Sequence, residues 1–523
     1  MWLKRMLTKD WQVKRLQQQS DFMLSGAQAK SGTIPVSPKM ILIVVDTLMS
    51  QSIDKGIEQN KLPTFQFLIE HGQYYKDVVT SFPTMSVSID STLLTGTYPD
   101  EHRVPGLVWY SEQDKKLINY GSGFWEIYRN GINQYLKDAL IRMNGTHLNP
   151  QVPTIFEELA RMGLKSGSVN GLIYRGSCDH QLNFPFWIHK PTVLPKNHKV
   201  KGPDLLAYGA FSNPLKSVKN LPVGPIGRFG FNNGYSLEMV THLIRNEQLP
   251  DFLYVYFPDL DTKIHKKGPS DLNGVIRTDN QLQTLLQAFG SREQALKKAV
   301  IIIMGDNGMT HVLPKNEQPV IDLGQSLEGY RVLKQGGAVT DQTEIILAVN
   351  DRMAYLYKLT HQYSFEQLSD ALKTDRRIDL LAWKENGWIR VVRSGSSKEF
   401  AYRPHGDMVD RYKQSWTLDK DPEVLDLQIN TQEHAVDYGQ YPDVLRRLYA
   451  ALHSHDGEYM VITAKPGYEL KYGSSPTHKG GAGHGGISQM ESLVPLIIAG
   501  TDHKPESLRV VDLKSFFLQH LKG

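Results

Sequence analysis

The sequence contains one cysteine, Cys178, in 523 residues. A single thiol cannot form a disulfide within the chain, so a disulfide-stapled fold is excluded. This cysteine usage suits a reducing compartment, and we predict a cytoplasmic protein. Cys178 is more simply interpreted as a buried or incidental thiol than as a nucleophile. Residues 178–180 could reach a site at the strand ends, but we expect them to form a loop.

Long hydrophobic runs are also missing. The longest, such as residues 40–45 and 299–304, are far shorter than the roughly 20 residues needed to span a membrane. The N-terminus carries positive charge without the apolar core of a signal peptide. We therefore expect no membrane span. Residues 1–38 read as a short amphipathic segment followed by a linker, with docking on the protein as the preferred interpretation and a weak membrane-surface contact as the alternative.

A strong excess of charge of one sign is absent as well. The formal net charge is +4, and no run of basic residues interleaves with aromatic ones, so we expect no nucleic-acid partner. The hydrophobic fraction of 40% and the aromatic fraction of 10% are typical of a globular protein. At this length, a large α/β core with insertions and a pair of domains are equally compatible with the chain.

Apolar runs and amphipathic segments alternate along the chain. Runs typical of buried strands occupy residues 40–45, 166–174, 252–257, 300–304 and 493–499, and helical patterns occupy 62–69, 154–162, 235–246, 281–289 and 512–521. This alternation predicts a mostly parallel sheet with helices on both faces. The pattern loosens in residues 311–476, which we interpret as a cap or accessory insertion. The predicted catalytic core is then 39–310 together with 477–523.

The segment 81–106 contains the first candidate for chemistry. Ser86 lies at the predicted start of a short helix that ends near Gly96. The N-terminus of a helix offers unpaired N–H groups and the positive end of its dipole, which favour an anion such as phosphate. Taken alone, Ser86 is better explained as an N-cap residue, and only the wider chain favours a catalytic role.

Four apolar runs end in polar residues that can bind metal ions. They end at Asp46, at Asp261 and His265, at Asp306 and Asn307, and in a glycine-rich segment around His484. Ligands collect at the carboxyl ends of strands in open α/β sheets, so these positions are favourable. Asp261 and His265 are four residues apart and would share one side of a helical turn. Asp259 and His478 are weaker alternatives for Asp261 and His484.

Together these motifs resemble the type I phosphodiesterase/nucleotide pyrophosphatase branch of the alkaline phosphatase superfamily. That family has an Asp after its first strand, a Ser or Thr nucleophile after a Pro-Thr-x approach, a DxxxH pair, a DHG triplet and a late HG. The resemblance spans residues 39–523. It implies an α/β, alkaline-phosphatase-like three-layer sandwich with a mostly parallel central sheet and an inserted cap.

The resemblance also implies roles for individual residues. Ser86 would be the catalytic nucleophile, and two divalent metal ions would be bound beside it. One ion would be held by Asp261, His265 and His484, and the other by Asp46, Asp306, Asn307 and the Ser86 oxygen.

Two departures from the family pattern affect this assignment. The triplet is Asp306-Asn307-Gly308, so an amide replaces an imidazole, and the second site would be all oxygen, which favours Mn²⁺ or Mg²⁺ over Zn²⁺ there. After the nucleophile, residues 88–90 are Ser-Ile-Asp where nucleotide pyrophosphatases have Pro-Asn-His. The Asn that holds phosphoryl oxygens is therefore missing, and Thr84, Ser88 or backbone N–H groups are the candidate substitutes for contacting substrate.

These features predict a metal-dependent hydrolase of phosphodiester or pyrophosphate bonds, acting on a small-molecule phosphoester through a phosphoserine-type intermediate. No Ser-His-Asp order or GxSxG elbow is apparent, so a metal is the better candidate activator of the serine. The alternatives are a phosphomonoesterase on the same core and a non-catalytic protein that binds metal or phosphate. A sulfatase is disfavoured because no Cys/Ser-x-Pro-x-Arg sequence surrounds Ser86. The natural substrate and the oligomeric state are left open by the sequence.

Overall fold

The computed structural model describes residues 39–121, 132–190, 192–216, 221 and 223–522. The predicted amphipathic segment and linker of residues 1–38 lie outside these ranges. Residues from Pro38 onward form one compact unit. In the described ranges, no helix has the length and apolar character required to cross a membrane.

The first strand, β1 (Lys39–Val45), lies inside the central sheet and is buried on both faces. Ile41, Ile43 and Val45 pack into one hydrophobic core, and Met40, Leu42 and Val44 pack into another. Side chains alternate across a strand, so a continuous apolar run fills both sides at once. This strand therefore specifies a layer of helices on each face.

Seven strands form the central sheet, in the order β2-β24-β10-β1-β9-β5-β8. Strands β10, β1, β9, β5 and β8 are mutually parallel, whereas β24 runs antiparallel to both β10 and β2. This arrangement confirms the prediction of a mostly parallel sheet. The strands are β1, β2 (Gly72–Val79), β5 (Ser166–Val169), β8 (Leu205–Ala207), β9 (Phe252–Phe257), β10 (Ala299–Gly305) and β24 (Leu493–Ala499).

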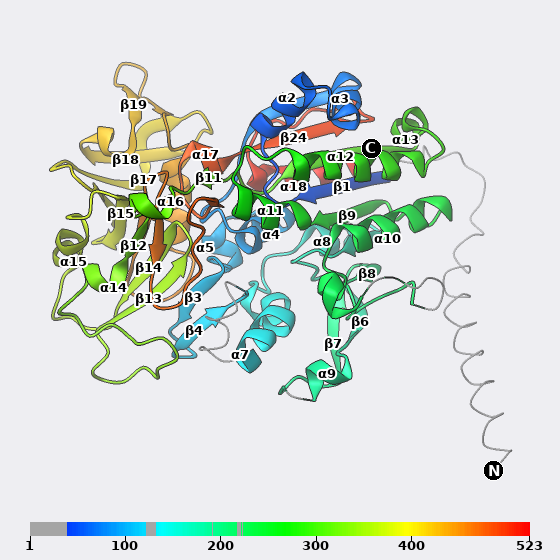
Figure 1. Ribbon diagram of the computed structural model, residues 1–523. Coiled ribbons are helices and arrows are strands. Elements are labelled where there is room, and N and C mark those ends of the chain that lie inside the picture. The colour runs from blue at the N-terminus through cyan, green and yellow to red at the C-terminus, as the bar shows by residue number, and fades with distance from the viewer. Residues whose placement is uncertain (1–38, 122–131, 191, 217–220, 222, 523) are drawn as a thin grey trace, which may run out of the picture. The chain divides into compact units, whose positions relative to one another are not determined.

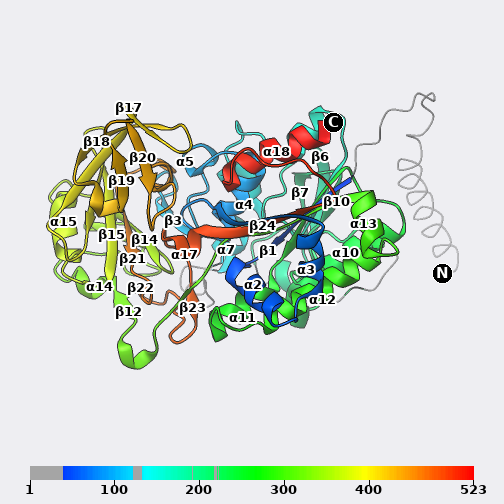
Figure 2. The same cartoon turned by 90° about the horizontal axis from the view of Figure 1, so that it is seen from above.

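Helices cover both faces of this sheet, as Figures 1 and 2 show. One face carries α2 (Ser50–Glu58), α3 (Pro63–Glu70), α10 (Asn233–Arg245), α11 (Asp259–Lys267), α12 (Asn273–Gln287) and α13 (Arg292–Lys298). The other carries α4 (Ser86–Thr95), α8 (Ile155–Arg161) and α18 (Val510–Lys522). The expected three-layer α/β sandwich is thus confirmed.

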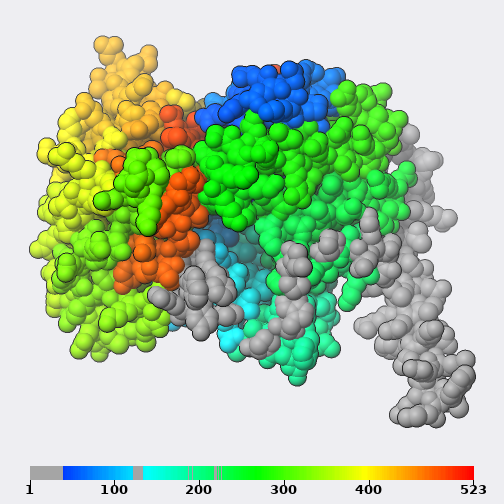
Figure 3. Space-filling model, viewed as in Figure 1, coloured from blue at the N-terminus to red at the C-terminus, as the bar shows by residue number. Residues whose placement is uncertain are grey.

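A second sheet of nine strands lies within the predicted accessory region 311–476. Figure 3 shows the orange part of the chain between this yellow-green sheet region and the green helices of the core. The boundaries of the cap stay a prediction. The strands are β13 (Ile345–Asn350), β14 (Met353–Lys358), β15 (Ile378–Glu385), β16 (Trp388–Arg393), β17 (Glu399–Asp410), β18 (Ser415–Lys420), β19 (Leu427–Asn430), β20 (Ala435–Tyr438) and β21 (Tyr459–Ala464).

Shorter elements complete the described chain. The helices are α5 (Pro99–His102), α7 (Ile132–Lys137), the π-helix η1 (Asp138–His147), α9 (Phe186–His189), η2 (Pro225–Gly230), η3 (Lys315–Glu317), α14 (Leu323–Ser326), α15 (Phe365–Leu372), η4 (Pro422–Leu425), α16 (Val444–Leu452) and α17 (Gln489–Ser492). The two-stranded sheets are β3 (Val108–Ser111) with β4 (Lys116–Asn119), β6 (Cys178–Asn183) with β7 (Asn197–Gly202), β11 (Thr310–His311) with β23 (Ala482–Gly483), and β12 (Val320–Asp322) with β22 (Glu469–Lys471).

Two local expectations are wrong. The predicted strand 166–174 ends at Val169, where Asn170 adopts a left-handed conformation with φ 57°. Residues 178–180, predicted as a loop, begin β6 and pair with β7. The segment CDHQLN has few apolar side chains and lies mostly exposed, so hydrophobic periodicity could not reveal it.

Candidate active site and metal centre

The site forms where three neighbouring strands end side by side. Val45, the last residue of β1, pairs with Gly305 at the end of β10 and with Phe257 at the end of β9. The residues that follow these strands therefore meet at one edge of the sheet. The backbone N–H of Thr47 donates to Asp306 Oδ1 at 2.9 Å, which shows how closely the two strand ends are connected.

Asp46, Asp306 and Asn307 place three oxygens with unmet bonding capacity in this region. The Tyr256 hydroxyl donates to Asp46 Oδ2 at 2.7 Å, Asn307 N donates to Asp306 Oδ1 at 2.8 Å, and Asn307 Nδ2 donates to Gly308 O at 3.1 Å. The remaining oxygens, Asp46 Oδ1, Asp306 Oδ2 and Asn307 Oδ1, are buried without a hydrogen-bond partner among the described residues. Leaving such groups unpaired is costly, and hard cations prefer oxygen ligands. This oxygen cluster therefore fits a divalent cation.

The electrostatics of the two carboxylates point the same way. Burial, reinforced by the neighbouring charge of Asp306, raises the pKa of Asp46 well above its usual value. Burial also raises the pKa of Asp306, against the opposing effect of hydrogen bonds from Thr47 and from Ser86. Two buried carboxylates close together repel each other, and a bound cation would relieve that repulsion.

Ser86 is the first residue of α4, which confirms the predicted helix start, and Gly96 caps its end with φ 68°. Burial raises the pKa of both Asp306 and Tyr256, and hydrogen bonding with the Ser86 side chain opposes that rise in each. The N-cap, Met85, supplies no side-chain hydrogen bond. The serine hydroxyl thus lies between a helix N-terminus and the oxygen cluster, a position suited to a nucleophile facing an anion.

A second group of ligand atoms consists of Asp261, His265 and His484, which we call the inner triad. Asp261 Oδ1 lies 3.1 Å from His265 Nε2 and 4.0 Å from His484 Nε2. One ligand atom from each residue fits within 4.8 Å of the others, as metal binding requires. Asp261 and His265 share one side of α11 because they are four residues apart. Two imidazoles and a carboxylate are ligands that suit Zn²⁺.

The charges of the inner triad stabilise one another. Burial raises the pKa of Asp261, but His265 and His484 outweigh that effect and leave it below its usual value. Burial lowers the pKa of His265, and the Asp261 carboxylate overcomes it, so that the pKa of His265 rises to about 9. Asp261 and His265 therefore stabilise each other's charged forms.

Hydrogen bonds connect the glycine-rich segment to Thr84, which lies two residues before Ser86. His484 Nδ1 lies 2.6 Å from the backbone oxygen of Thr84, which fixes the ring and leaves Nε2 facing Asp261. The Thr84 hydroxyl accepts from Gly485 N at 2.8 Å and donates to Gly486 O at 3.0 Å. Gly485 has φ 106°, and a Cβ there would lie 2.4 Å from the backbone oxygen of Asn350. The glycine at this position therefore permits the close approach of the backbone of the second sheet.

The residues proposed to contact substrate have structural partners instead. Thr84 is fully buried by the contacts just described, and the buried Ser88 hydroxyl donates to Val104 O at 3.0 Å. Their contact with substrate stays a prediction. Ile89 and Asp90, which replace the family's Asn-His, are also fully buried. Tyr254 donates to Asp90 Oδ1 at 2.8 Å, and burial raises the pKa of Asp90 to about 8.

The geometry also separates the alternative ligands. Asp259 accepts from the backbone N–H of Asn233 at 3.2 Å and from the Arg228 side chain. Asp259 is therefore engaged outside the inner triad, and Asp261 is the carboxylate that lies with His265 and His484. The ring of His478, the alternative to His484, packs at a tilt of 36° against that of His265, with centroids 4.0 Å apart. His478 thus lies beside the inner triad.

Sequence reasoning missed Tyr256, which orients the Asp46 carboxylate from the neighbouring strand. Its position in β9 places it on the same face as Tyr254, and both hydroxyls donate to buried carboxylates. The sequence offered one signal for this role, two tyrosines two positions apart in an apolar strand. That Tyr256 donates to Asp46 became apparent only from the strand order, which places β9 beside β1.

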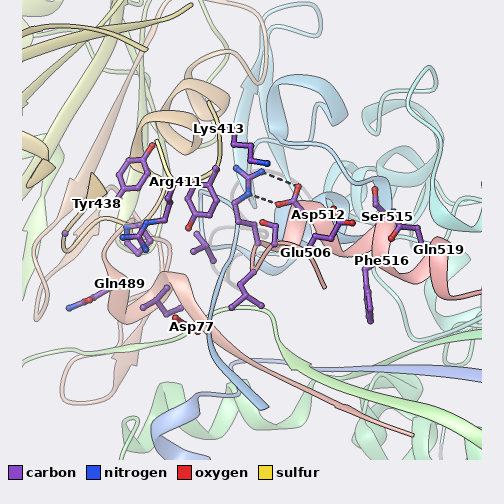
Figure 4. A pocket seen from close by; sticks show the side chains of 18 residues that line it. Asp77, Arg411, Lys413, Tyr438, Gln489, Glu506, Asp512, Ser515, Phe516 and Gln519 are labelled. Carbon is purple, nitrogen blue, oxygen red and sulfur yellow. Dashed lines mark hydrogen bonds and ion pairs between the residues drawn. The ribbon is translucent and has the colours of Figure 1, made fainter. Parts of the chain in front are cut away.

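A cavity of about 860 Å³ lies elsewhere, between α18 and the second sheet, and Figure 4 shows it from close by. Arg411, Lys413 and Arg509 line it, but so do Asp77, Glu506 and Asp512. Arg509 Nε donates to Asp512 at 2.7 Å. None of the residues of the oxygen cluster or the inner triad lines this cavity. Its charges of both signs give it no preference for an anionic ligand.

Known proteins resemble this chain in fold and in sequence profile. A comparison with curated protein sequences finds no match. Among solved structures, murine ectonucleotide pyrophosphatase/phosphodiesterase 5 is similar, with a TM-score of 0.54 and 15% identity over 92% of this chain and 95% of that one. An inactive variant of the murine protein, solved in complex with AMP, has a TM-score of 0.52 and 15% identity over 93% and 95%.

Phosphonoacetate hydrolase from Sinorhizobium meliloti, in complex with phosphonoacetate, has a TM-score of 0.55 and 14% identity over 93% of this chain and 96% of that one. At these identities the structural likeness confirms the fold. The sequence profile of the type I phosphodiesterase/nucleotide pyrophosphatase family matches residues 40–486. Because that match covers most of the chain, this protein belongs to the type I phosphodiesterase/nucleotide pyrophosphatase family and is an enzyme of the phosphoric ester hydrolase class.

Proposed function

We propose that this enzyme is a metal-dependent hydrolase of phosphodiester or pyrophosphate bonds in small molecules, with Ser86 as its covalent nucleophile. The observation that carries the proposal is the oxygen cluster of Asp46, Asp306 and Asn307 beside the Ser86 hydroxyl. Three buried oxygens of this cluster have no hydrogen-bond partner in the part of the chain that the structure describes. Such an arrangement suits a cation that faces both the nucleophile and a phosphoryl group.

Two divalent ions, one held by the oxygen cluster and one by the inner triad, would neutralise the phosphoryl oxygens and lower the pKa of the serine hydroxyl. Asp46 is oriented for this task by Tyr256, and Asp306 by Thr47 N. His484 is oriented by the backbone oxygen of Thr84. The N-terminus of α4 adds unpaired N–H groups that favour the developing negative charge.

The reaction then has two balanced steps. Ser86 Oγ forms a bond to phosphorus as the bond from phosphorus to the leaving oxygen breaks, and the leaving alcohol or phosphate takes up a proton. Water next attacks the phosphorus of the seryl ester, breaks its bond to Oγ and returns a proton to the serine. Splitting one displacement into two is the general advantage of covalent catalysis.

The identity of the substrate is a narrower question. Solved relatives bind AMP and phosphonoacetate, which supports a small phosphate- or phosphonate-bearing substrate here. Ile89 is buried where nucleotide pyrophosphatases have an Asn that holds phosphoryl oxygens. A phosphomonoesterase on the same core is therefore the second candidate.

Turnover by protein that has been stripped with a chelator and reloaded with Mn²⁺ or Zn²⁺ tests the proposal. We expect bis(p-nitrophenyl) phosphate to be hydrolysed faster than p-nitrophenyl phosphate. Ser86→Ala should abolish turnover, while Ser91→Ala, a buried serine on the same helix whose hydroxyl donates to Val87 O, should keep it. Acid-quenched wild-type enzyme should carry the substituted phosphoryl group on the peptide that contains Ser86. Retained activity in Ser86→Ala would exclude the covalent mechanism.

A further inference from the structure

A second set of ligand-type side chains lies directly against the inner triad. It consists of His478 and Asp351, which lie next to His265. Asp351 follows β13 in the turn to β14, so it comes from the second sheet, whereas His265 comes from α11 of the core. The chain therefore brings together three distant segments at this point. Neither Asp351 nor His478 is needed for the two-ion arrangement proposed above.

His478 is held in the manner of a metal-binding histidine. Its Nδ1 lies 2.8 Å from Oε1 of Glu469, a fully buried carboxylate, and its backbone N–H donates to Oε2 of the same residue at 2.7 Å. In the inner triad, His265 Nδ1 faces Ala482 O at 2.8 Å, and His484 Nδ1 faces Thr84 O. In each of these imidazoles Nδ1 thus faces an acceptor. Nε2 of His265 and of His484 faces Asp261, whereas in His478 it is Nδ1 that lies 3.8 Å from Asp351 Oδ2.

From this geometry we propose that His265, Asp351 and His478 form an outer position for a divalent ion of the Zn²⁺ type. One ligand atom from each of these residues lies within 4.8 Å of the others. Two imidazoles and one carboxylate are a common ligand set for Zn²⁺. This inference rests on the metal dependence proposed above, but not on the substrate.

The outer position and the inner triad share a single nitrogen. His265 has only Nε2 to offer, because its Nδ1 faces Ala482 O. An ion bound through that atom lies either with Asp261 and His484 or with Asp351 and His478. The two positions are therefore alternatives for one ion, which could pass from one to the other while His265 Nε2 stays its ligand. His478 keeps 22% of its side chain exposed, so solvent reaches the outer position and an ion arriving there has an entry path to the inner triad.

The sharpest test removes the inner position and leaves the outer one. Chelator-stripped protein is titrated with Zn²⁺ against a competing chelator of known affinity, in the wild type, in His484→Ala and in the double variant His484→Ala/His478→Ala. We expect His484→Ala to retain its ion with about 10–100-fold weaker affinity, the scale on which a lost supporting contact acts. The double variant should lose that ion. His453→Ala, whose ring faces Tyr449 instead, serves as the control and should behave as wild type.

Position is checked separately from affinity. Diffraction data collected at the zinc absorption edge from Zn²⁺-loaded His484→Ala should place the ion among His265, Asp351 and His478. Asp261→Asn replaces His484→Ala in both measurements if circular dichroism shows that the first variant is unfolded, since it leaves the glycine-rich segment untouched.

The outcomes also separate this inference from the proposed function. Equal Zn²⁺ affinities in the single and double variants, or a zinc peak outside the outer position, would overturn the outer position alone. Wild-type protein that binds no divalent ion would overturn both the outer position and the metal-dependent mechanism.

Discussion

At the scale of the residue, Asn307 determines the character of the oxygen cluster. Its side-chain nitrogen donates to Gly308 O, so its free oxygen is the atom left for an ion. An amide oxygen is a weaker ligand for Zn²⁺ than imidazole and suits Mn²⁺ or Mg²⁺. This single substitution therefore predicts which ion the enzyme uses at that position.

Added Mn²⁺ should raise the activity of chelator-treated protein more than added Zn²⁺ does, because the ligands of this cluster are all oxygens. Asn307→His should tighten binding there and narrow the difference between the two ions. The measurement is a metal titration of both proteins with one diester substrate. Equal responses of the wild type to Zn²⁺ and Mn²⁺ would contradict the argument.

Tyr256 offers a second residue-level prediction. Tyr256→Phe removes the donor to Asp46 Oδ2 and leaves a buried carboxylate oxygen unpaired, so the metal affinity of the oxygen cluster should fall by about 10–100-fold. Isothermal titration with Mn²⁺ measures that affinity directly. Tyr254→Phe is the matched control, because it lies on the same face of β9 but donates to Asp90, which is outside the cluster. If both variants bind Mn²⁺ as tightly as wild type, Tyr256 does not orient the ligand.

At the scale of the element, the sequence predicted the central strands well. It predicted exposed hairpins and long-range strand pairings poorly. β1, β9 and β10 are apolar runs long enough to be read directly, and α4 has a serine start and a glycine end. Because each of these parallel strands is followed by proposed ligands, the sequence also placed those ligands at one edge of the sheet. The exposed hairpin that begins at Cys178 has no apolar period and was missed.

Long-range contacts account for the rest of what was missed. Asp351 and Glu469 lie in the predicted cap, and nothing near either residue in the sequence links it to His265 or His478. Pairing of β13 with β14 and of β12 with β22 brings them there. Such pairings depend on packing of the whole chain, to which local pattern is insensitive.

The side chain of His102 at the end of α5 contacts Thr92 of α4, and its burial leads to a prediction about pH. His102 is fully buried, with Nε2 3.0 Å from the Thr92 hydroxyl and Nδ1 accepting from Val104 N at 3.1 Å. Burial lowers the pKa of His102 to about 3. The folded protein thus leaves this imidazole neutral between about pH 3 and its unfolded value near 6.5, where the unfolded chain binds a proton.

The sign follows from that difference in bound protons. The free energy of unfolding should fall as the pH drops through this window, by up to about 1.4 kcal/mol per pH unit for this one group. His102→Gln should reduce the dependence of the unfolding free energy on pH by the equivalent of up to one bound proton. His361→Gln, at an exposed position, should leave that dependence unchanged. Urea unfolding at several pH values between roughly 3.5 and 7, the window set by the two pKa values, measures how the unfolding free energy changes with pH. Identical slopes in all three proteins would show that His102 is not the group responsible.

At the scale of the whole molecule, the second sheet helps to build the site. Arg352, at the start of β14, donates its backbone N–H to His484 O at 3.1 Å and its side chain to Ala464 O and Tyr468 O. It also forms an ion pair with Glu491 of α17, and both side chains are fully buried. The core and the second sheet are thus joined through the segment that carries a proposed metal ligand.

This ion pair supports the last prediction. Glu491 also accepts from the Thr310 hydroxyl at 2.8 Å and from Gly486 N, two residues beyond His484. Glu491→Gln removes the ion-pair partner of the buried Arg352 guanidinium and leaves only the charges of Asp379, Glu469 and Asp351 acting on it. It should therefore lower the free energy of unfolding by up to about 3–5 kcal/mol. It should also weaken Zn²⁺ binding at the inner triad, because the glycine-rich segment loses an anchor.

Urea unfolding and Zn²⁺ titration of the same preparations measure the two effects together. The double variant Arg352→Met/Glu491→Leu should cost less stability than Glu491→Gln, since it removes both charges and leaves neither unpaired. Lys76→Ala breaks the exposed pair with Asp54, in which the lysine side chain is 57% exposed, and should change stability by less than about 1 kcal/mol. If Glu491→Gln lowers stability but leaves Zn²⁺ affinity intact, the second sheet stabilises the fold without shaping the metal site. If neither quantity changes, the buried pair does not couple the core to the second sheet.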